Sequence, residues 1–290
     1  MKTKTAATPL ETKIDFAVTL RVIKANPNGD PLNGNRPRTT PDGFGEISDV
    51  ALRRKARNRR MQLVGDILIQ PDDSRLDEHG SIRARVDAAK LPESNSEFCR
   101  AACEKWFDVR AFGGVFAFAA KEGSDSVSTS VRGPISIQSA ITVDPVTLTT
   151  TQITMCTNGE DKKKAGSDDN LLSSDRIGKK HRVEHGIYVA FGAINTQLAG
   201  ITGFTDEDAE AFKDILTSLF ENDASAARPA GSMEVINVFW WKHSSLHGDA
   251  SSSRVHRSLT VASDGTYTLS PILGSDGKVV PLTPEVLHGF

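Results

Sequence analysis

Near the start of the chain stand, in order, IDFAVTLRV (residues 14–22), NPNGDP (residues 26–31) and SDVALRRKARNRR (residues 48–60). Apolar and polar side chains alternate in the first segment, which is typical of a half-buried β-strand. The second segment contains Asn, Gly and Pro but little apolar material, so it predicts a surface loop with free backbone N–H groups. The third predicts an α-helix that Ser48 or Asp49 caps. A strand, a loop and a basic helix therefore begin the fold.

The predicted helix carries six cations within residues 53–60. At about 100° per residue, Leu52, Ala56 and Leu63 form one narrow apolar stripe. One side of this stripe is lined by Arg53, Arg57 and Arg60, and the other by Lys55 and Arg59. A solvated helix face is one interpretation of such a run. The loop beside it favours a second interpretation, in which loop donors and cations bind a phosphodiester chain.

The composition describes an ordinary globular protein. The chain has 290 residues, of which 38% are hydrophobic and 25% are charged, and this length suffices for one large domain or two smaller ones. The net charge of -2 and the pI near 6.4 argue against a protein that coats nucleic acid everywhere. Any nucleic-acid binding must therefore come from local clusters of cations on a near-neutral background.

The three cysteines, Cys99, Cys103 and Cys156, form no close pair, and the N-terminus lacks the apolar core of a signal peptide. A reducing cytoplasm is therefore the expected location. Cys99 and Cys103 fall on a predicted helix around residues 96–107, and packing is their favoured role because no second pair of metal ligands lies nearby. The longest apolar stretch, residues 186–204, is interrupted by polar residues and glycines, so it does not predict a membrane span.

The remaining elements complete a recognisable order. After the first strand and the basic helix come strands around residues 135–143 and 187–191, a helix capped by Thr205, and a strand over residues 233–241. The order strand, helix, strand, strand, helix, strand predicts an α+β, ferredoxin-like fold, the scaffold of RNA-recognition domains. A hairpin that turns at Asp264-Gly265 follows.

Two polar segments interrupt this order, at residues 70–130 and 144–182. The second is the least core-like part of the chain, rich in Thr, Lys and Asp. A polar segment of this length inside a domain is either a disordered loop or a functional projection. Strand propensity over residues 147–156 favours an extended hairpin or arm.

Several short patterns resemble metal or phosphate sites but lack the required setting. His181 and His185 match an inverted zinc-protease pattern, yet the strand-like residues that follow argue against the helix that such a site needs. His243 and His247 are also four residues apart and are expected to lie in a surface loop. The run KKKAGS (residues 162–167) lacks the spaced glycines of a phosphate loop. No catalytic residue, cofactor or metal site is therefore assigned.

Two carboxylates, Asp30 and Asp42, lie in the loop that would border a bound nucleic acid. An acid in that place can orient a ribose hydroxyl or hold a metal ion for cleavage of the RNA backbone. The alternative, which we favour, is that Asp30 only stabilises the turn.

Six motifs resemble the backbone subunit of type I CRISPR effector complexes, the Cas-seven family, and most closely its type I-C branch. They are NPNGDP (26–31), NRPR (35–38), LRRKARN (52–58), DVR with FG (108–113), RGP (132–134), and GKKHR with GIY (178–188). The resemblance implies that many copies assemble side by side along one CRISPR RNA, as a helical spine that presents the guide to target DNA. It also implies a capping subunit and a large target-recognition subunit as partners.

In this family an RNA-recognition core forms the palm, a helical insertion the fingers and a projecting hairpin the thumb. The resemblance therefore implies a single domain over residues 1–290, with fingers at 70–130 and a thumb at 144–182. Ile153 or Met155 would be the apolar wedge at a displaced base. The aromatic pair on which RNA-recognition domains stack bases is not apparent, which favours binding through the RNA backbone, with sequence read by base pairing.

The resemblance implies guide-RNA contacts at twelve positions. These are Asn35, Arg36, Arg38, Arg53, Arg54, Lys55, Arg57, Arg132, Gly133, Lys179, Lys180 and Arg182. On this interpretation, reversing the charges of Arg53 and Arg57 is expected to abolish assembly on RNA and to leave the monomer folded. Two alternatives stay open: a metal-dependent ribonuclease of the related type III backbone kind, with Asp30 or Asp42 as the acid, and an α/β protein whose basic helix is only a solvated face.

Overall fold

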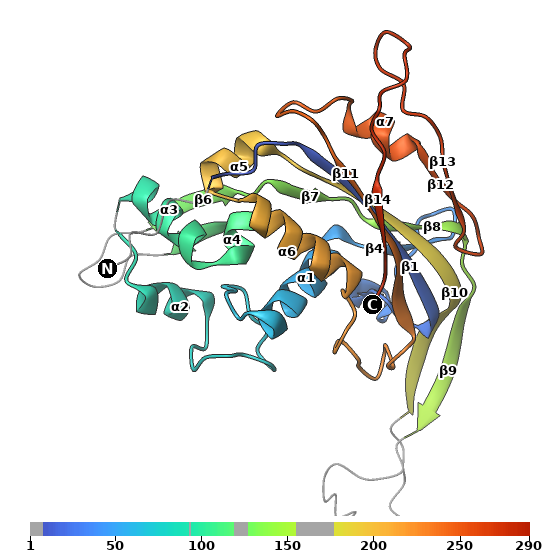
Figure 1. The fold of residues 1–290 in the computed structure, drawn as a ribbon. Helices are drawn as coiled ribbons and strands as arrows, with labels where there is room; N and C mark the ends of the chain where they lie inside the picture. Colours follow the sequence, from blue (N-terminus) through green and yellow to red (C-terminus); the bar gives the residue numbers. More distant parts are fainter. Residues whose placement is uncertain (1–7, 93, 119–126, 155–176) are drawn as a thin grey trace, which may run out of the picture.

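An eight-stranded sheet forms the centre of the fold in the computed structural model, which describes residues 8–92, 94–118, 127–154 and 177–290. The strands run in the order β14, β11, β1, β10, β8 and β4, and β7 and β9 also pair with β10 (Figure 1). All of these pairs are antiparallel. Their bounds are Ile14–Ala25 (β1), Phe44–Ile47 (β4), Ile135–Ile137 (β7), Ala140–Pro145 (β8), Leu148–Thr154 (β9), Ile177–Ile194 (β10), Met233–Lys242 (β11) and Glu285–His288 (β14).

Three two-stranded sheets and seven α-helices complete the described part of the chain. The small sheets pair Gly29–Asp30 (β2) with Arg36–Pro37 (β3), Gly113–Phe118 (β5) with Val127–Arg132 (β6), and Leu259–Val261 (β12) with Tyr267–Leu269 (β13). The helices are Asp49–Leu63 (α1), Ile82–Ala89 (α2), Asn95–Lys105 (α3), Phe107–Phe112 (α4), Thr196–Thr202 (α5), Asp206–Thr217 (α6) and Ser252–Arg257 (α7). A mixed α/β fold with a large antiparallel sheet is thereby confirmed.

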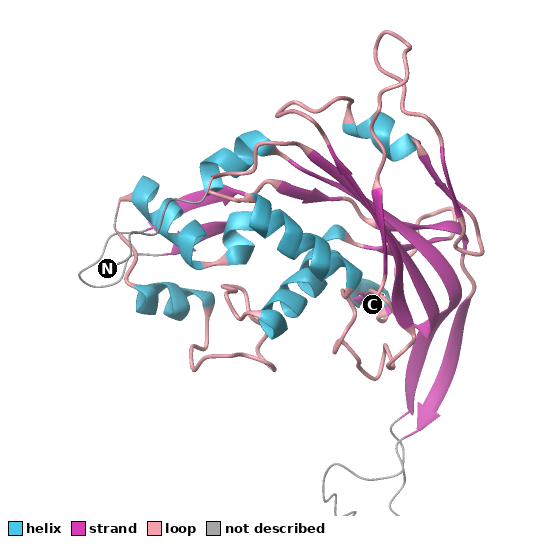
Figure 2. Ribbon diagram, in the orientation of Figure 1, coloured by secondary structure: helices cyan, strands magenta, loops and turns pink. Residues whose placement is uncertain are grey.

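The first strand was expected to be half-buried, and this is wrong. β1 lies between β10 and β11, and Ile14 to Leu20 are all buried. The alternation in the sequence is real, but each face of the strand is covered: Phe16 belongs to the main core, while Ala17 belongs to a second core with Trp241 and residues of the C-terminal segment. Figure 2 shows most helices on one side of the sheet and α7 on the other.

Helices α1 and α6 cover the main core side of the sheet. Ser48 caps α1 through Ala51 N–H, as predicted. A capping box between Thr205 and Asp208 begins α6. The predicted apolar stripe of α1 is right for Leu52 and Ala56 and wrong for Leu63, which is 51% exposed at the end of the helix. No helix in the described ranges is long and apolar enough to cross a membrane.

Helices α2 to α4 and the β5–β6 hairpin form a helical unit with its own small core. Phe98, Cys103, Trp106 and Phe116 are buried in it, so the expected packing role of Cys103 is confirmed. At Gly113, φ is 78° and an added Cβ would lie 2.3 Å from the Val131 carbonyl oxygen. The close approach expected of this glycine is therefore made by backbone.

Strand β9 and residues 177–183 of β10 form a two-stranded projection, here called the arm (Figure 1). The pairing runs from Thr154 opposite Ile177 to Leu148 opposite Val183. The strand expected at residues 147–156 is confirmed over its described part. Met155, Cys156 and the run at residues 162–167 lie outside the described residues.

His243 was expected at the surface, and it is instead 2% exposed. Its Nε2 lies 2.8 Å from Oδ2 of Asp15, and its Nδ1 accepts the backbone N–H of Asp249 at 2.8 Å. Lys13 Nζ lies 2.9 Å from the same Asp15 oxygen, and His256 Nε2 lies 3.7 Å from Oδ1. This polar network fastens the segment after β11 to the first strand.

We predict that acid weakens this attachment. Burial alone would raise the pKa of Asp15, but hydrogen bonds from His243, Ser252 and Lys13 outweigh it and hold that pKa low. Burial lowers the pKa of His256 below 6.5. Both depressed values mean that the unfolded chain binds protons more readily, so the free energy of unfolding should fall as pH drops, first through 6.5 for His256 and then in the acid range for Asp15.

Thermal unfolding across this pH range tests the prediction. His256→Gln retains a donor for the Gly192 carbonyl, which His256 Nε2 contacts at 3.1 Å, but it cannot titrate. The variant should therefore lose the stability change near pH 6.5 and keep the one at lower pH. An unchanged profile in the variant would contradict the assignment to His256.

Candidate nucleic-acid interface

The loop NPNGDP folds back on itself as a small hairpin. Gly29 pairs with Pro37 and Asp30 with Arg36, and a 3-10 turn, Pro31–Asn33, joins the two strands. The side chain of Asp30 accepts the Leu32 N–H at 3.2 Å and lies 3.5 Å from Arg38. These contacts support the interpretation that Asp30 stabilises the turn.

This loop and the arm form the two walls of an open cleft of about 490 Å³. The cleft is lined by Asn33, Gly34 and Arg36 from the loop and by Lys179 and His181 from β10. Side chains alternate along a strand, so Lys179 and His181 share one face of the arm and Lys180 points to the other. The structure thus brings together two of the predicted cations, Arg36 and Lys179, from segments far apart in the chain.

The chemistry of the cleft suits a sugar–phosphate chain. Arg36 and Lys179 are exposed, and neither makes an ion pair within the described ranges. The Nδ1 of His181 lies 2.8 Å from Thr150 Oγ1, which fixes the imidazole ring and leaves its second nitrogen for another partner. Cations, an imidazole and an exposed loop backbone are the groups that contact phosphates and sugars.

Three cleft residues were missed in the sequence: Asn33, Gly34 and His181. A signal for His181 existed, because it lies two residues from Lys179 in a segment with strand character. The sequence predicted no RNA contact for His181, which appears there only within the GKKHR motif and in the zinc-like pattern with His185. Those two histidines lie on one strand, about 13 Å apart along it, and no three His, Cys, Asp or Glu side chains in the described chain are grouped to hold a metal ion.

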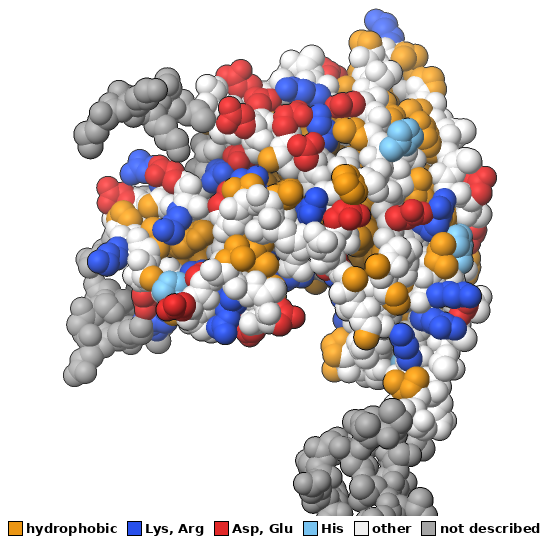
Figure 3. Space-filling view, turned by 60° about the horizontal axis from the view of Figure 1, so that its bottom comes forward, with side chains coloured by type: hydrophobic (Ala, Val, Ile, Leu, Met, Phe, Trp, Pro, Cys, Tyr) orange, Lys and Arg blue, Asp and Glu red, His pale blue; other side chains and the backbone are white. Residues whose placement is uncertain are grey.

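The other face of the arm carries Lys180 and Arg182. Arg182 Nε lies 3.1 Å from Glu184, and the Thr149 hydroxyl donates to the same carboxylate. These hydrogen bonds, from Thr149 first and then Arg182, lower the pKa of Glu184. Figure 3 shows Lys and Arg side chains gathered over the arm side of the molecule.

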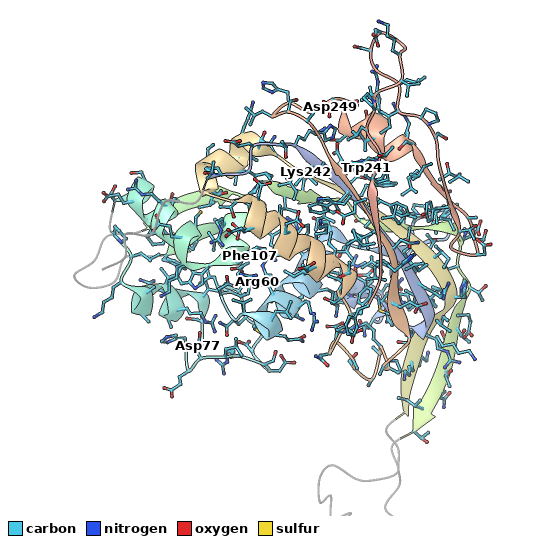
Figure 4. The ribbon with its side chains drawn as sticks, viewed as in Figure 1. Arg60, Asp77, Phe107, Trp241, Lys242 and Asp249 are labelled. Atoms are coloured by element: carbon cyan, nitrogen blue, oxygen red, sulfur yellow. The ribbon has the colours of Figure 1, made fainter. Side chains whose placement is uncertain are left out.

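The basic helix behaves differently from the sequence expectation, because its cations are held within the protein. The partners are Asp49 for Arg53, the Ile69 carbonyl for Arg54, Asp223 for Lys55, Asp108 for Arg57, the Ser218 hydroxyl for Arg59 and Asp66 for Arg60. Lys55 is only 8% exposed. Arg60 also lies over the Phe107 ring at 4.4 Å, and Figure 4 shows the two side by side.

Burial of Arg57 and Lys55 is deep enough to affect their titration. Burial lowers the pKa of Arg57, and Asp108 opposes this effect. Burial lowers the pKa of Lys55 in the same way, and Asp223 opposes it. Both cations hold distant parts of the chain to α1. Arg57 in particular holds a carboxylate that also accepts the backbone N–H groups of Leu68 and Ile69.

Arg132 and Gly133 lie away from the cleft. Arg132 ends β6 opposite Gly113, and an added Cβ on Gly133 would lie 2.3 Å from the Phe112 carbonyl carbon. The next strand, β7, pairs with the far end of β10 at Ile194. Lys179 is fifteen residues earlier on β10, up to about 50 Å away along the strand. The twelve predicted contacts therefore form separate groups.

Comparison with known proteins assigns a family. Residues 12–272 match the family model described as CRISPR-associated protein Cas7. The chain belongs to the Cas7 family. A curated relative from Haloferax volcanii, also described as CRISPR-associated protein Cas7, is 25% identical over 228 residues. The match covers 71% of this chain but only 63% of the relative.

Two solved structures show a low similarity to this Cas7-family chain, each with a TM-score below 0.5. One is titled CRISPR RNA-guided surveillance complex, pre-nicking, with a TM-score of 0.45 and 15% identity over 79% of this chain and 78% of that one. The other is titled CRISPR RNA-guided surveillance complex, with a TM-score of 0.43 and 16% identity over 79% of this chain and 69% of that one.

In this Cas7-family chain, residues of the motifs LRRKARN and DVR make side-chain contacts that join separate helices. Arg57 of LRRKARN pairs with Asp108 of DVR at 3.2 Å. Arg110 of the same DVR motif donates two hydrogen bonds of 2.7 Å to Asp208, which begins α6. These motifs therefore join α1, α4 and α6 around the main core.

The ribonuclease alternative has a direct test at Asp30. Because Asp30 is engaged in the turn and no three metal-ligating side chains are grouped among the described residues, we expect the protein to leave a bound single-stranded RNA intact when Mg²⁺ or Mn²⁺ is added. Asp30→Ala should then change RNA affinity, through a looser turn, and not RNA length. Metal-dependent shortening by the unmodified protein that Asp30→Ala abolishes would establish the ribonuclease instead.

Proposed function

We propose that this protein binds CRISPR guide RNA as the repeated backbone subunit of an RNA-guided surveillance complex in antiviral defence. The observation that carries the proposal is the cleft between loop and arm, where Arg36 and Lys179 face the same space without internal ion-pair partners among the described residues. Family membership is consistent with this role, and both titles of the similar structures name RNA-guided surveillance complexes.

The finer assignment extends this proposal. The motifs support the type I-C branch. The strand order β11, β1, β10, β8, with α1 and α6 between strands in the chain, supports a ferredoxin-like palm. The helical unit within residues 70–130 would be the fingers and residues 144–182 the thumb. Copies side by side on one guide, a capping subunit, a large target-recognition subunit and target DNA paired to the guide complete the proposed assembly, in the cytoplasm.

Among the twelve predicted contacts, we propose different roles. Direct phosphate contact is best supported for Arg36 and Lys179, together with His181, which the sequence did not predict. Asn35 and Arg38 flank the cleft on the loop, while Lys180, Arg182, Arg132 and Gly133 would serve other parts of a long RNA. Arg53, Arg54, Lys55 and Arg57 would act mainly by holding α1 and the segments around it in place.

Co-expression with a CRISPR repeat–spacer transcript tests the proposed function. The purified particle should be far larger than the 31.3 kDa chain, should absorb as nucleic acid at 260 nm, and should release RNA of uniform length. A protein that elutes as a free monomer without RNA, although processed guide is present in the cell, would reject the proposal.

A further inference from the structure

The loop wall of the cleft contains two consecutive residues in the left-handed region. Gly34 has φ 59° and Asn35 has φ 58°. Glycine adopts this conformation freely, whereas other residues do so only where surrounding contacts hold them, even though Asn tolerates it better than most. Contacts around Asn35 must therefore hold this turn.

The shortest hydrogen bond to Asn35 comes from Asn26, at the base of the loop. Asn26 is 4% exposed, and its side-chain amide donates to the Asn35 carbonyl at 2.7 Å. The backbone of Asn26 is itself fixed, because its N–H donates to the Ala227 carbonyl at 2.9 Å. On the other side of the turn, the Asn35 N–H donates to the Asp30 carbonyl at 2.8 Å.

Gly29 closes the turn from a third direction. An ideal Cβ at Gly29 would lie 2.0 Å from the side-chain oxygen of Asn35 and 3.2 Å from its carbonyl oxygen. The side chain of Asn35 therefore lies over Gly29 rather than along the cleft, whose lining does not include Asn35.

The Asn35 carbonyl belongs to the peptide group that joins Asn35 to Arg36. A peptide group is planar, so a hydrogen bond that fixes its oxygen also fixes the direction in which the chain enters Arg36. Arg36 is the cation that this wall presents to the cleft opposite Lys179. A buried group nine residues before the turn in sequence thus controls an exposed cation.

We infer that Asn26 is a positioning residue for RNA binding: its buried amide presets the peptide between Asn35 and Arg36 and so holds Arg36 ready for a phosphate group. This inference rests on the proposed function of the cleft. Asn26 does not touch the RNA. It lowers the cost of ordering the loop when RNA binds, because the turn is already formed in the free protein.

A double-mutant cycle on the full chain tests the inference, with a fluorescently labelled single-stranded oligoribonucleotide as the probe. Asn26→Ala should weaken RNA binding on the order of tenfold, as expected for the loss of one buried hydrogen bond. Arg36→Ala should also weaken binding. If Asn26 acts through Arg36, the double variant should bind no more weakly than Arg36→Ala alone.

A purely structural role predicts a different result, in which the two losses add. Asn237→Ala is the matched control, because Asn237 is another buried asparagine, 5% exposed, in the sheet. It should lower the unfolding temperature without changing RNA affinity. If Asn26→Ala does not fold, Asn26→Ser replaces it, since the serine hydroxyl stays polar but is one bond shorter than the amide.

The possible outcomes distinguish a failure of the proposed RNA site from a failure of the positioning role of Asn26. Wild-type affinity in Arg36→Ala would overturn the proposed RNA site itself. A loss in Arg36→Ala with none in Asn26→Ala would overturn the positioning role alone, and additive losses would do the same. Non-additive losses, together with an unchanged RNA affinity in the Asn237→Ala control, would establish the positioning role.

Discussion

Arg57→Ala should cost about 3–5 kcal/mol of unfolding free energy, because it leaves a buried carboxylate without its cation. Asp108 is fully buried, and Arg57 Nε contacts it at 3.2 Å. Arg57 also lies over the Phe112 ring at 5.0 Å, so the variant loses packing as well as charge. Urea unfolding followed by circular dichroism measures the effect. From the sequence we expected a monomer with reversed charges at Arg53 and Arg57 to remain folded. The buried Arg57–Asp108 pair leads us to expect a loss of stability instead.

Arg53→Ala is the matched control on the same helix. Arg53 pairs with Asp49 one turn earlier, and both side chains are about one-third exposed. Pairs of this kind contribute less than about 1 kcal/mol, so this variant should unfold almost as the unmodified protein does. Equal losses in the two variants would show that burial of the Arg57–Asp108 pair is not what matters.

Replacing Arg36 and Lys179 together by alanine should weaken RNA binding strongly and reduce its dependence on salt. Each lost phosphate contact on a single strand lowers the slope of log affinity against log salt by about 0.7, so two lost contacts should lower it by about 1.4. Fluorescence anisotropy over a range of KCl concentrations gives both quantities. The fold should be unaffected, because neither side chain makes an ion pair within the described residues.

Two further variants locate the effect. Lys278→Ala removes an exposed lysine on the C-terminal segment, 85% exposed, and should leave both affinity and slope unchanged. Lys180 lies on the opposite face of the arm, so Lys180→Ala tests whether RNA binding depends on the cleft or on the arm as a whole. If Lys180→Ala and the cleft variant reduce the slope per charge equally, the RNA contacts both faces of the arm and is not confined to the cleft.

Much of the local structure could be predicted from the sequence because it depends on neighbouring residues. The Ser48 cap and the Thr205 capping box each need only residues three positions apart. The hairpin at Asp264-Gly265 needs a residue that accepts a positive φ, and Gly265 has φ 88°. Alternation in β1 correctly predicted a strand, yet it could not show that a second core covers the other face, because that core comes from residues after 238.

The sequence pointed to several residues of the candidate site but not to their arrangement in space. The sequence singled out the loop that follows Asn26 and the basic run at 178–182, and residues of both segments line one cleft. It also ranked the densest cationic run first, and that run proved to be the one most engaged with internal partners. A cluster of arginines in sequence carries no information on whether carboxylates elsewhere in the chain meet it.

The sequence by itself determined the elements, their caps and the family motifs, since these follow from interactions within a few residues and from residue type. Only the tertiary structure decided which cations remain available. Arg57 and Lys55 pair with carboxylates 51 and 168 residues away. Arg36 and Lys179 instead line the two walls of the cleft and are exposed to solvent. The physical reason is that an ion pair depends on which opposite charges the fold brings into contact, and their separation along the chain does not limit it.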